Sequence, residues 1–262
     1  MNFYQAKKYL SYWFFAKYKN GHGIHSPLVY DLLTNIIEDF TPFYCFEEIE
    51  QYRRTLLQNN KTITVTDYGA GSKVNDSNKR KISHIAKYSL TKPKYAQLLF
   101  RLVNYFKPNN ILELGTSLGL TTVYLALPNS KTKVYTLEGC PEIAKIAGAT
   151  HFELNAINID MYVGKFQDVL PNLLTEIKTV DFAFVDGNHS YKATIENYNL
   201  LKNYSNNSSI FIFDDIYWSE AMTQAWNEIK ADNSITLSID LFQFGIVFFM
   251  KDFKKQNFRI KF

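Results

Sequence analysis

From residue 109 onward, the chain alternates short apolar runs with stretches of helical length. The apolar runs are rich in β-branched and aromatic residues, and they begin near positions 110, 133, 159, 180, 209, 235 and 245. Helix-length stretches separate the first five runs, and this alternation predicts a parallel sheet with helices on both faces. Only a few residues around Gln243 and Phe244 separate the last two runs. Because that spacing is typical of a hairpin, we expect the final strand to run antiparallel to its neighbour.

The first 90 residues have a mainly helical pattern. Residues 2–19 are aromatic and amphipathic, and Ser26-Pro27 suits the start of a helix over residues 28–40. Further helices are expected at 46–59, 83–90 and 93–106, with a short strand within 61–69. The predicted fold class is therefore α/β, with a Rossmann-like, mostly parallel seven-stranded sheet in a domain over residues 91–262. Residues 1–90 are expected to form a helical N-terminal extension that serves as a lid, a substrate-binding region or a dimer interface. A contact of its aromatic first helix with a membrane surface is a further alternative, which the basic charge supports only weakly.

The composition is that of a soluble globular protein. With 262 residues and 46% hydrophobic content, the chain can bury a full core. Its net charge of +4 is too small to indicate a nucleic-acid partner. Lysines interrupt the apolar runs near the N-terminus, so we expect neither a signal peptide nor integral membrane association. Cys45 and Cys140 lie far apart and fit reduced thiols, which favours a cytoplasmic location.

Two glycine-rich turns compete for the role of ligand-binding loop. "TDYGAGSK" (66–73) precedes a polar, charged stretch, whereas "ILELGTSLGL" (111–120) precedes an apolar helical pattern. A ligand-binding turn needs a buried strand before it and a helix after it, so that backbone amides face the ligand. The strand expected after the second turn ends in Glu138, where a carboxylate can accept both hydroxyls of a ribose. We therefore expect the second turn to bind the ligand and the first to be a simple turn.

The second turn lacks the G-x-G-x-x-G spacing with which dinucleotide folds approach a pyrophosphate. Within it only Gly115 and Gly119 are glycine, and Glu113 precedes them. A carboxylate at Glu113 would repel a pyrophosphate and could attract a cationic amino group. These features suit S-adenosylmethionine (SAM), which carries an α-amino group and a sulfonium and no phosphate.

The segment "ILELGTSLGLTTVYLA" resembles the first motif of the class I SAM-dependent methyltransferases, and its details lean towards the catechol O-methyltransferase-like, cation-dependent group. The resemblance covers about residues 90–250. It implies that the turn lines the methionine part of SAM, that Glu138 takes the ribose hydroxyls, and that "GKFQDVLPNL" flanks the adenine. The cofactor-binding residues so implied are Glu113, Gly115, Thr116, Ser117, Gly119, Thr121, Glu138, Gly164, Lys165, Phe166 and Gln167. Phe166 could instead belong to the core, and Lys165 could be a solvated surface charge.

Acidic residues follow two of the predicted buried strands. Asp186 ends "FAFVD", and Asp214 and Asp215 end "IFIFDD". Ligands of open α/β sheets lie beyond the carboxyl ends of the strands, and three carboxylates there suit Mg²⁺ or another divalent cation. In the cation-dependent O-methyltransferases that the sequence resembles, acidic or amide residues at these positions bind the metal. The alternative is that Asp186 contacts the cofactor or water, while Asp214 and Asp215 cap the next helix.

His189 lies three residues after Asp186, in "VDGNHSY". The enzymes that this sequence resembles place a general base, Lys or His, at that spacing. A neutral hydroxyl attacks a sulfonium methyl group slowly, and a base that removes its proton makes it a competent nucleophile. Histidine suits this task because its ordinary pKa is near neutrality. The alternative is a loop histidine that is hydrogen-bonded to the backbone.

The expected function is O-methylation of a small hydroxylated acceptor with SAM, assisted by a divalent cation. One alternative is a metal-independent N- or protein methyltransferase on the same fold. Two others are an NAD(P)-dependent oxidoreductase and a SAM-binding protein without turnover. The expected partner is a small molecule, and the sequence leaves the acceptor and a homodimer open.

Overall fold

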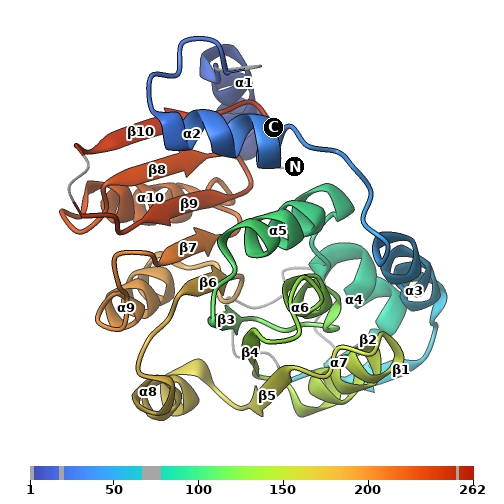
Figure 1. Ribbon diagram of the computed structural model, residues 1–262. Coiled ribbons are helices and arrows are strands. Elements are labelled where there is room, and N and C mark those ends of the chain that lie inside the picture. Colours follow the sequence, from blue (N-terminus) through green and yellow to red (C-terminus); the bar gives the residue numbers. More distant parts are fainter. Residues whose placement is uncertain (1–2, 18–20, 67–77, 252–253) are drawn as a thin grey trace. The chain divides into compact units, whose positions relative to one another are not determined.

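The computed structural model describes residues 3–17, 21–66, 78–251 and 254–262 (Figure 1). The fold is mixed α/β with mostly parallel strands, as predicted. Apart from Thr66, the "TDYGAGSK" turn lies outside the described residues. Within those residues, no helix has the length and apolar character needed to span a membrane. The chain divides into a central unit, Thr41–Ile177, and a terminal unit, Met1–Phe40 with Lys178–Phe262; the predicted division after residue 90 stays a prediction.

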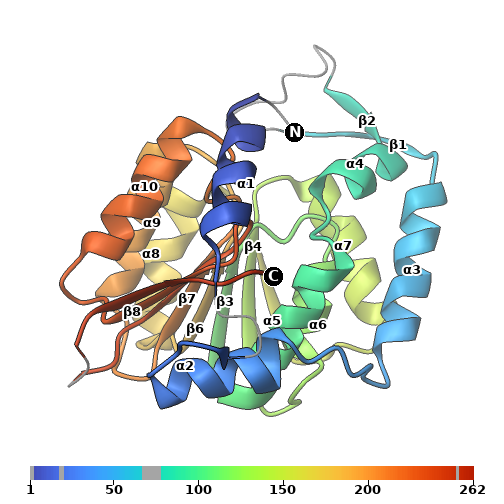
Figure 2. The ribbon, with the colours of Figure 1, turned by 90° about the horizontal axis from the view of Figure 1, so that it is seen from above.

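The central unit carries three parallel strands and their helices. The strands β3 (Asn110–Leu114), β4 (Lys133–Glu138) and β5 (Ile159–Val163) pair in the order β3-β4-β5. The helices are α3 (Phe46–Gln58), α4 (Ile82–Ser89), α5 (Pro93–Phe106), α6 (Leu120–Ala126), α7 (Pro141–Glu153) and α8 (Phe166–Ile177). A separate antiparallel pair is formed by β1 (Thr62–Thr64) and β2 (Lys79–Lys81). Figure 2 shows α5, α6 and α7 alongside β3 and β4.

The terminal unit combines the N-terminal helices with the last five strands. Its strands are β6 (Phe182–Val185), β7 (Ile210–Phe213), β8 (Leu237–Asp240), β9 (Gly245–Phe248) and β10 (Gln256–Arg259). They pair in the order β10-β8-β9-β7-β6, and β9 runs antiparallel to both of its neighbours. The helices are α1 (Phe3–Phe15), α2 (Pro27–Leu32), the π-helical segment η2 (Leu33–Ile37), α9 (Tyr191–Lys202) and α10 (Glu220–Ala231).

The structure confirms the seven strands expected from the apolar runs, and β9 is the expected antiparallel strand. Two features were missed. The strand β10 has the polar sequence QNFR with exposed or half-buried residues, so it carries no apolar pattern; it pairs in parallel with β8. The strand β2 is the basic tripeptide KRK, which forms a pair only because β1 lies beside it.

The strands that precede the candidate catalytic residues are apolar and buried throughout. β6 reads FAFV and β7 reads IFIF, with every residue buried, as is typical of strands covered on both faces. The helices α9 and α10 begin at serine caps, because Ser190 accepts a hydrogen bond from the Ala193 N–H and Ser219 accepts one from the Met222 N–H. The polar residues after β6 therefore lie between a buried strand and a capped helix, which fixes their position.

Candidate functional site

The glycine turn after β3 is held against β4 by the backbone. The N–H groups of Gly115 and Thr116 both donate to the Leu137 carbonyl, and the Gly119 N–H donates to the Thr116 carbonyl. Gly119 has φ +81, and a Cβ atom there would lie 2.7 Å from Nε2 of His151. Only glycine fits this position without strain, because both the backbone conformation and the space exclude a side chain.

The Glu138 carboxylate lies at the end of β4 and is fixed by backbone amides. Its Oε2 accepts from the Ser117 N–H at 2.9 Å, and its Oε1 accepts from the Cys140 N–H at 2.8 Å. Burial raises the pKa of Glu138, while the N–H groups of Cys140, Ser117 and Gly139 oppose that shift. Each carboxylate oxygen can accept more than one hydrogen bond, so the group is oriented and keeps acceptor capacity for a ligand. Ribose binding by Glu138 stays a prediction.

The Glu113 carboxyl is fully buried and forms hydrogen bonds within the central unit. Its Oε2 accepts from the hydroxyls of Thr122 at 2.5 Å and Thr136 at 2.6 Å, and no hydrogen-bond partner is found for its Oε1. Burial raises its pKa to about 7, with a smaller contribution from Glu138, against the two hydroxyl hydrogen bonds. These contacts tie β3, β4 and α6 together. A direct contact between Glu113 and the SAM amino group stays a prediction.

The other predicted cofactor-binding residues of the turn differ in whether their side chains already form hydrogen bonds within the protein. The Thr116 hydroxyl lies 2.6 Å from the Thr136 hydroxyl, and the Thr121 hydroxyl donates to Thr91 at 3.0 Å. Both threonines are buried, so their side chains support the turn. The Ser117 hydroxyl is buried and has no partner. Ser117 also has φ +50, so its backbone is held in the left-handed region.

The predicted adenine-flanking segment follows β5. The Gly164 N–H donates to the Glu138 carbonyl at 2.9 Å, which places this segment beside the end of β4. Phe166 is half-buried at the start of α8, while Lys165 and Gln167 are exposed. The structure therefore brings the segment next to Glu138, as the predicted arrangement requires, and the contact of each side chain with adenine stays a prediction.

In the terminal unit, the structure brings the predicted catalytic residues together. His189 Nε2 lies 3.6 Å from Asp186 Oδ1 and 3.9 Å from Asp215 Oδ2, and the His189 and Trp218 ring centroids are 6.1 Å apart. His189, Asp186 and Asp215 are all partly exposed, so they are open to a ligand. Asp214 belongs to the same group, because a side-chain hydrogen bond joins it to Asp186.

The Asp214 carboxyl is buried and hydrogen-bonded to neighbouring groups. Its carboxyl accepts from the Asp215 N–H at 2.7 Å and is hydrogen-bonded to the side chains of Gln243 and Asp186. Burial and then the Asp215 charge raise the pKa of Asp214 well above its ordinary value. A hydrogen bond between two carboxyl groups needs a proton on one of them. The raised pKa favours the protonated form of Asp214 beside the Asp215 charge.

The three acids do not fit the expected metal site. Among the described residues, no group of three or more His, Cys, Asp or Glu side chains is arranged to hold a metal ion. The reason is visible at Asp214, whose oxygens are turned to the Asp215 amide, Gln243 and Asp186. The alternative of helix capping does not describe these acids either, since Ser219 caps α10.

Sequence reasoning missed the contact of His151 with the glycine turn. The two are far apart in the sequence, and no motif marks His151; it meets Gly119 because α7 packs on α6. Burial lowers the pKa of His151 to about 4, so the imidazole is neutral at pH 7.

The start of the first glycine turn also contacts the region of Glu138. The Thr66 N–H donates to Sγ of Cys140 at 3.3 Å, and Cys140 follows Glu138 by two residues in the sequence.

Residues 112–216 match a protein family described as "Methyltransferase domain". An uncharacterized protein of Acanthamoeba polyphaga mimivirus is 26% identical over 149 residues, which are 52% of this chain and 66% of that relative, just under two thirds of its length. The matched family segment contains the turn after β3, Glu138 and the residues that follow β6 and β7.

Several solved structures have a similar fold. An O-methyltransferase from Bacillus cereus in complex with SAH has a TM-score of 0.58 at 18% identity, covering 85% of this chain and 96% of that one. The SAH-bound methyltransferase PaMTH1 of Podospora anserina has a TM-score of 0.60 at 13% identity, covering 87% and 98%. The O-methyltransferase TomG of Streptomyces achromogenes, in complex with SAM, has a TM-score of 0.58 at 16% identity, covering 85% and 95%. At these identities the likeness establishes the fold.

Proposed function

We propose that this chain is a class I SAM-dependent methyltransferase that methylates an oxygen atom of a small hydroxylated acceptor. The observation that carries the proposal is the position of His189 between the carboxylates of Asp186 and Asp215, in a partly exposed group after β6 and β7. An imidazole flanked by two carboxylates is suited to take a proton, because the positive charge it gains is stabilised where it forms.

The cofactor side of the proposal is supported by the Glu138 carboxylate. Two backbone amides orient it, and its remaining lone pairs can accept the two ribose hydroxyls of SAM. When bound, SAM supplies a methyl group that its sulfonium makes electrophilic. The Ser117 hydroxyl, buried and without a partner, is a further polar group that a ligand could satisfy.

On the acceptor side, His189 would remove the hydroxyl proton as the acceptor oxygen attacks the methyl carbon. The methyl–sulfur bond would break with its electron pair left on sulfur, and the proton would stay on His189 until release to solvent. Asp186 and Asp215 would hold the imidazole and balance its charge. Such general-base assistance contributes about 10²–10⁴-fold to a rate. No step passes through a metal, because the three acids do not fit a metal site; cation assistance is left to the experiment.

Calorimetric titration of SAH into the full chain tests the cofactor site, first in chelator and then with Mg²⁺. Glu138→Gln should weaken binding by about 10–100-fold, because charge-assisted hydrogen bonds contribute roughly 1.5–3 kcal/mol each. The control is Glu142→Gln, which removes a partly exposed carboxylate, paired with Lys145, near the start of α7. Equal binding by wild type and Glu138→Gln would contradict the assignment of Glu138.

Transfer of a labelled methyl group from SAM to a panel of phenols, alcohols and amines tests the reaction. His189→Gln should keep SAH affinity and lose at least 100-fold in rate on hydroxylated acceptors. The control His22→Gln changes an exposed histidine and should keep full activity. Label that appears on amines alone would overturn O-methylation. If activity is lost in chelator and restored by Mg²⁺, the reaction requires a divalent cation.

A further inference from the structure

The helix α1 presents an apolar stripe to solvent. Phe3, Leu10 and Phe14 are 89%, 59% and 69% exposed, and their spacing places them on one face of the helix. Trp13 flanks this stripe and is also exposed. We define Phe3, Leu10, Trp13 and Phe14 as the α1 stripe. Isolated exposed apolar residues are ordinary on protein surfaces, but a contiguous group of large ones marks an interaction site.

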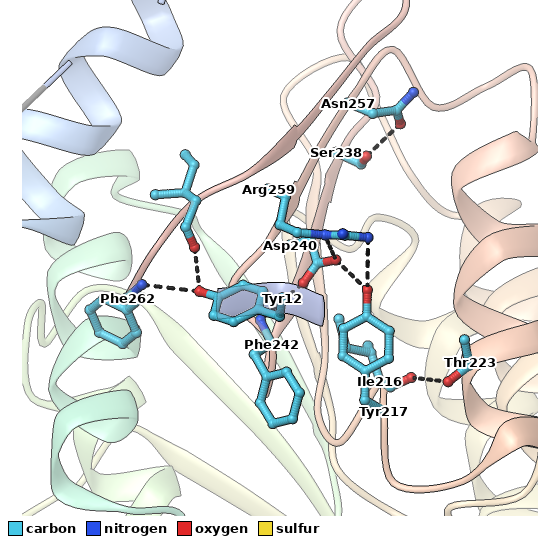
Figure 3. A network of polar contacts seen from close by, with 11 residues as sticks. Tyr12, Ile216, Tyr217, Thr223, Ser238, Asp240, Phe242, Asn257, Arg259 and Phe262 are labelled. Carbon is cyan, nitrogen blue, oxygen red and sulfur yellow. Dashed lines mark hydrogen bonds and ion pairs between the residues drawn. The ribbon is translucent and has the colours of Figure 1, made fainter. Parts of the chain in front are cut away.

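The opposite face of α1 is anchored, so the α1 stripe is not the packing face of the helix. The Tyr12 hydroxyl donates to the Ile260 carbonyl. It also accepts from the Phe262 N–H, as Figure 3 shows. The Tyr4 hydroxyl donates to Thr223 at 2.8 Å. Aromatic packing adds to these bonds, because the Tyr12 ring centroid lies 5.4 Å from that of Phe242. Rotating α1 to bury its stripe would break all of these contacts.

The charge around the α1 stripe is positive. The first 30 residues contain four lysines and neither Asp nor Glu. Lys7 is exposed and lies on the same face as Phe3 and Leu10, between them along the helix. The C-terminal strand region adds Lys261, whose Nζ lies 4.5 Å from the Trp13 ring centroid.

From this arrangement we propose that α1 docks the protein on the surface of an anionic lipid bilayer. A helix with Trp, Phe and Leu on one face and lysines around them suits the interface between acyl chains and headgroups, while basic residues are attracted to anionic lipids. A second copy of this chain fits less well, since a two-fold interface sets the same patch against itself. The lysines would then face each other without an acidic residue from either α1. The proposed surface does not depend on the identity of the methyl acceptor.

Cosedimentation of the full chain with lipid vesicles tests this proposal. Vesicles of phosphatidylcholine with phosphatidylglycerol should bind the protein at low salt, and vesicles of phosphatidylcholine alone should bind it at least tenfold more weakly. The double variant Leu10→Ser/Phe14→Ser should weaken binding at least tenfold, because two apolar side chains no longer enter the interface. Lys7→Gln should weaken it about fivefold, and by less as salt is raised. The emission of Trp13 should shift to the blue on binding, and Trp13→Phe should remove that shift.

The matched control is Phe152→Ser, which removes an exposed phenylalanine from α7 in the other unit. It should bind vesicles as wild type does, and near-ultraviolet circular dichroism should show that all variants keep the native fold. Wild-type protein that fails to bind anionic vesicles at low salt would overturn the proposal. So would equal binding by Leu10→Ser/Phe14→Ser. A third outcome would assign the α1 stripe to a second copy of the chain: the wild type forms a concentration-dependent dimer and does not bind vesicles, and Leu10→Ser/Phe14→Ser alone among the variants is monomeric.

Discussion

Glu113 should make the stability of this protein fall as pH rises through the neutral range. The carboxyl is fully buried, and burial raises its pKa from 4.5 to about 7. Between these values the folded protein keeps the proton while the unfolded chain releases it. The folded state therefore binds more protons, and the free energy of unfolding decreases with pH.

The size of the effect follows from the two pKa values. Linkage between pKa values of 4.5 and about 7 gives a loss of about 2–3 kcal/mol between pH 5 and pH 8 for this one group. Other groups titrate over the same range, so the useful quantity is the difference between wild type and Glu113→Gln. The amide does not ionise, and it can still accept the hydroxyls of Thr122 and Thr136. The wild type should therefore lose about 2–3 kcal/mol more than the variant over this interval.

Urea unfolding at several pH values between 5 and 8, followed by circular dichroism, measures this difference. The amide adds a constant offset, since its buried N–H groups need partners, and that offset does not change with pH. Glu153→Gln serves as the control because it removes an exposed carboxyl, and its pH dependence should follow that of wild type. Parallel curves for wild type and Glu113→Gln would refute the reasoning, because they would show that Glu113 has the same pKa in both states.

Three substitutions test packing and polar contacts near the candidate site. Gly119→Ala should lower the free energy of unfolding by about 2–4 kcal/mol and weaken SAH binding, since a left-handed backbone and a 2.7 Å contact both oppose a Cβ atom. Gly245→Ala should cost about 1–3 kcal/mol in urea unfolding, because its Cβ would lie 2.7 Å from the buried ring of Trp226. Tyr217→Phe should cost about 1–3 kcal/mol by the same measurement, because it removes the 2.5 Å hydrogen bond to the buried Asp240.

Two further variants provide controls for these predictions. Gly148→Ala places a Cβ 3.7 Å from the nearest Met161 carbon, within a helix, and should be neutral or slightly stabilising. Tyr44→Phe changes an exposed tyrosine and should leave stability unchanged. If Gly119→Ala proved as stable as Gly148→Ala, the conclusion that the turn packs too tightly against α7 for a Cβ atom would be wrong.

The order of the elements and the position of the candidate site follow from patterns in the sequence alone. Apolar runs separated by helix-length stretches specify β3 to β9, and the short spacing before the last of them specifies its antiparallel direction. The glycine turn was found because its residues lie together in the chain. Glu138 was found because it ends a predicted buried strand. Asp186 and His189 were found because they follow the end of another such strand.

The burial of each polar group, in contrast, depends on the tertiary structure. Glu113 looked open in the sequence, yet threonines from α6 and β4 close over it. Asp214 and Asp215 are neighbours in the sequence, but one is buried in hydrogen bonds and the other is partly exposed beside His189. The strand β10 and the contact of His151 with Gly119 also depend on distant partners. Burial and hydrogen bonding of this kind join residues far apart in the chain, so periodicity and motif spacing carry no signal for them.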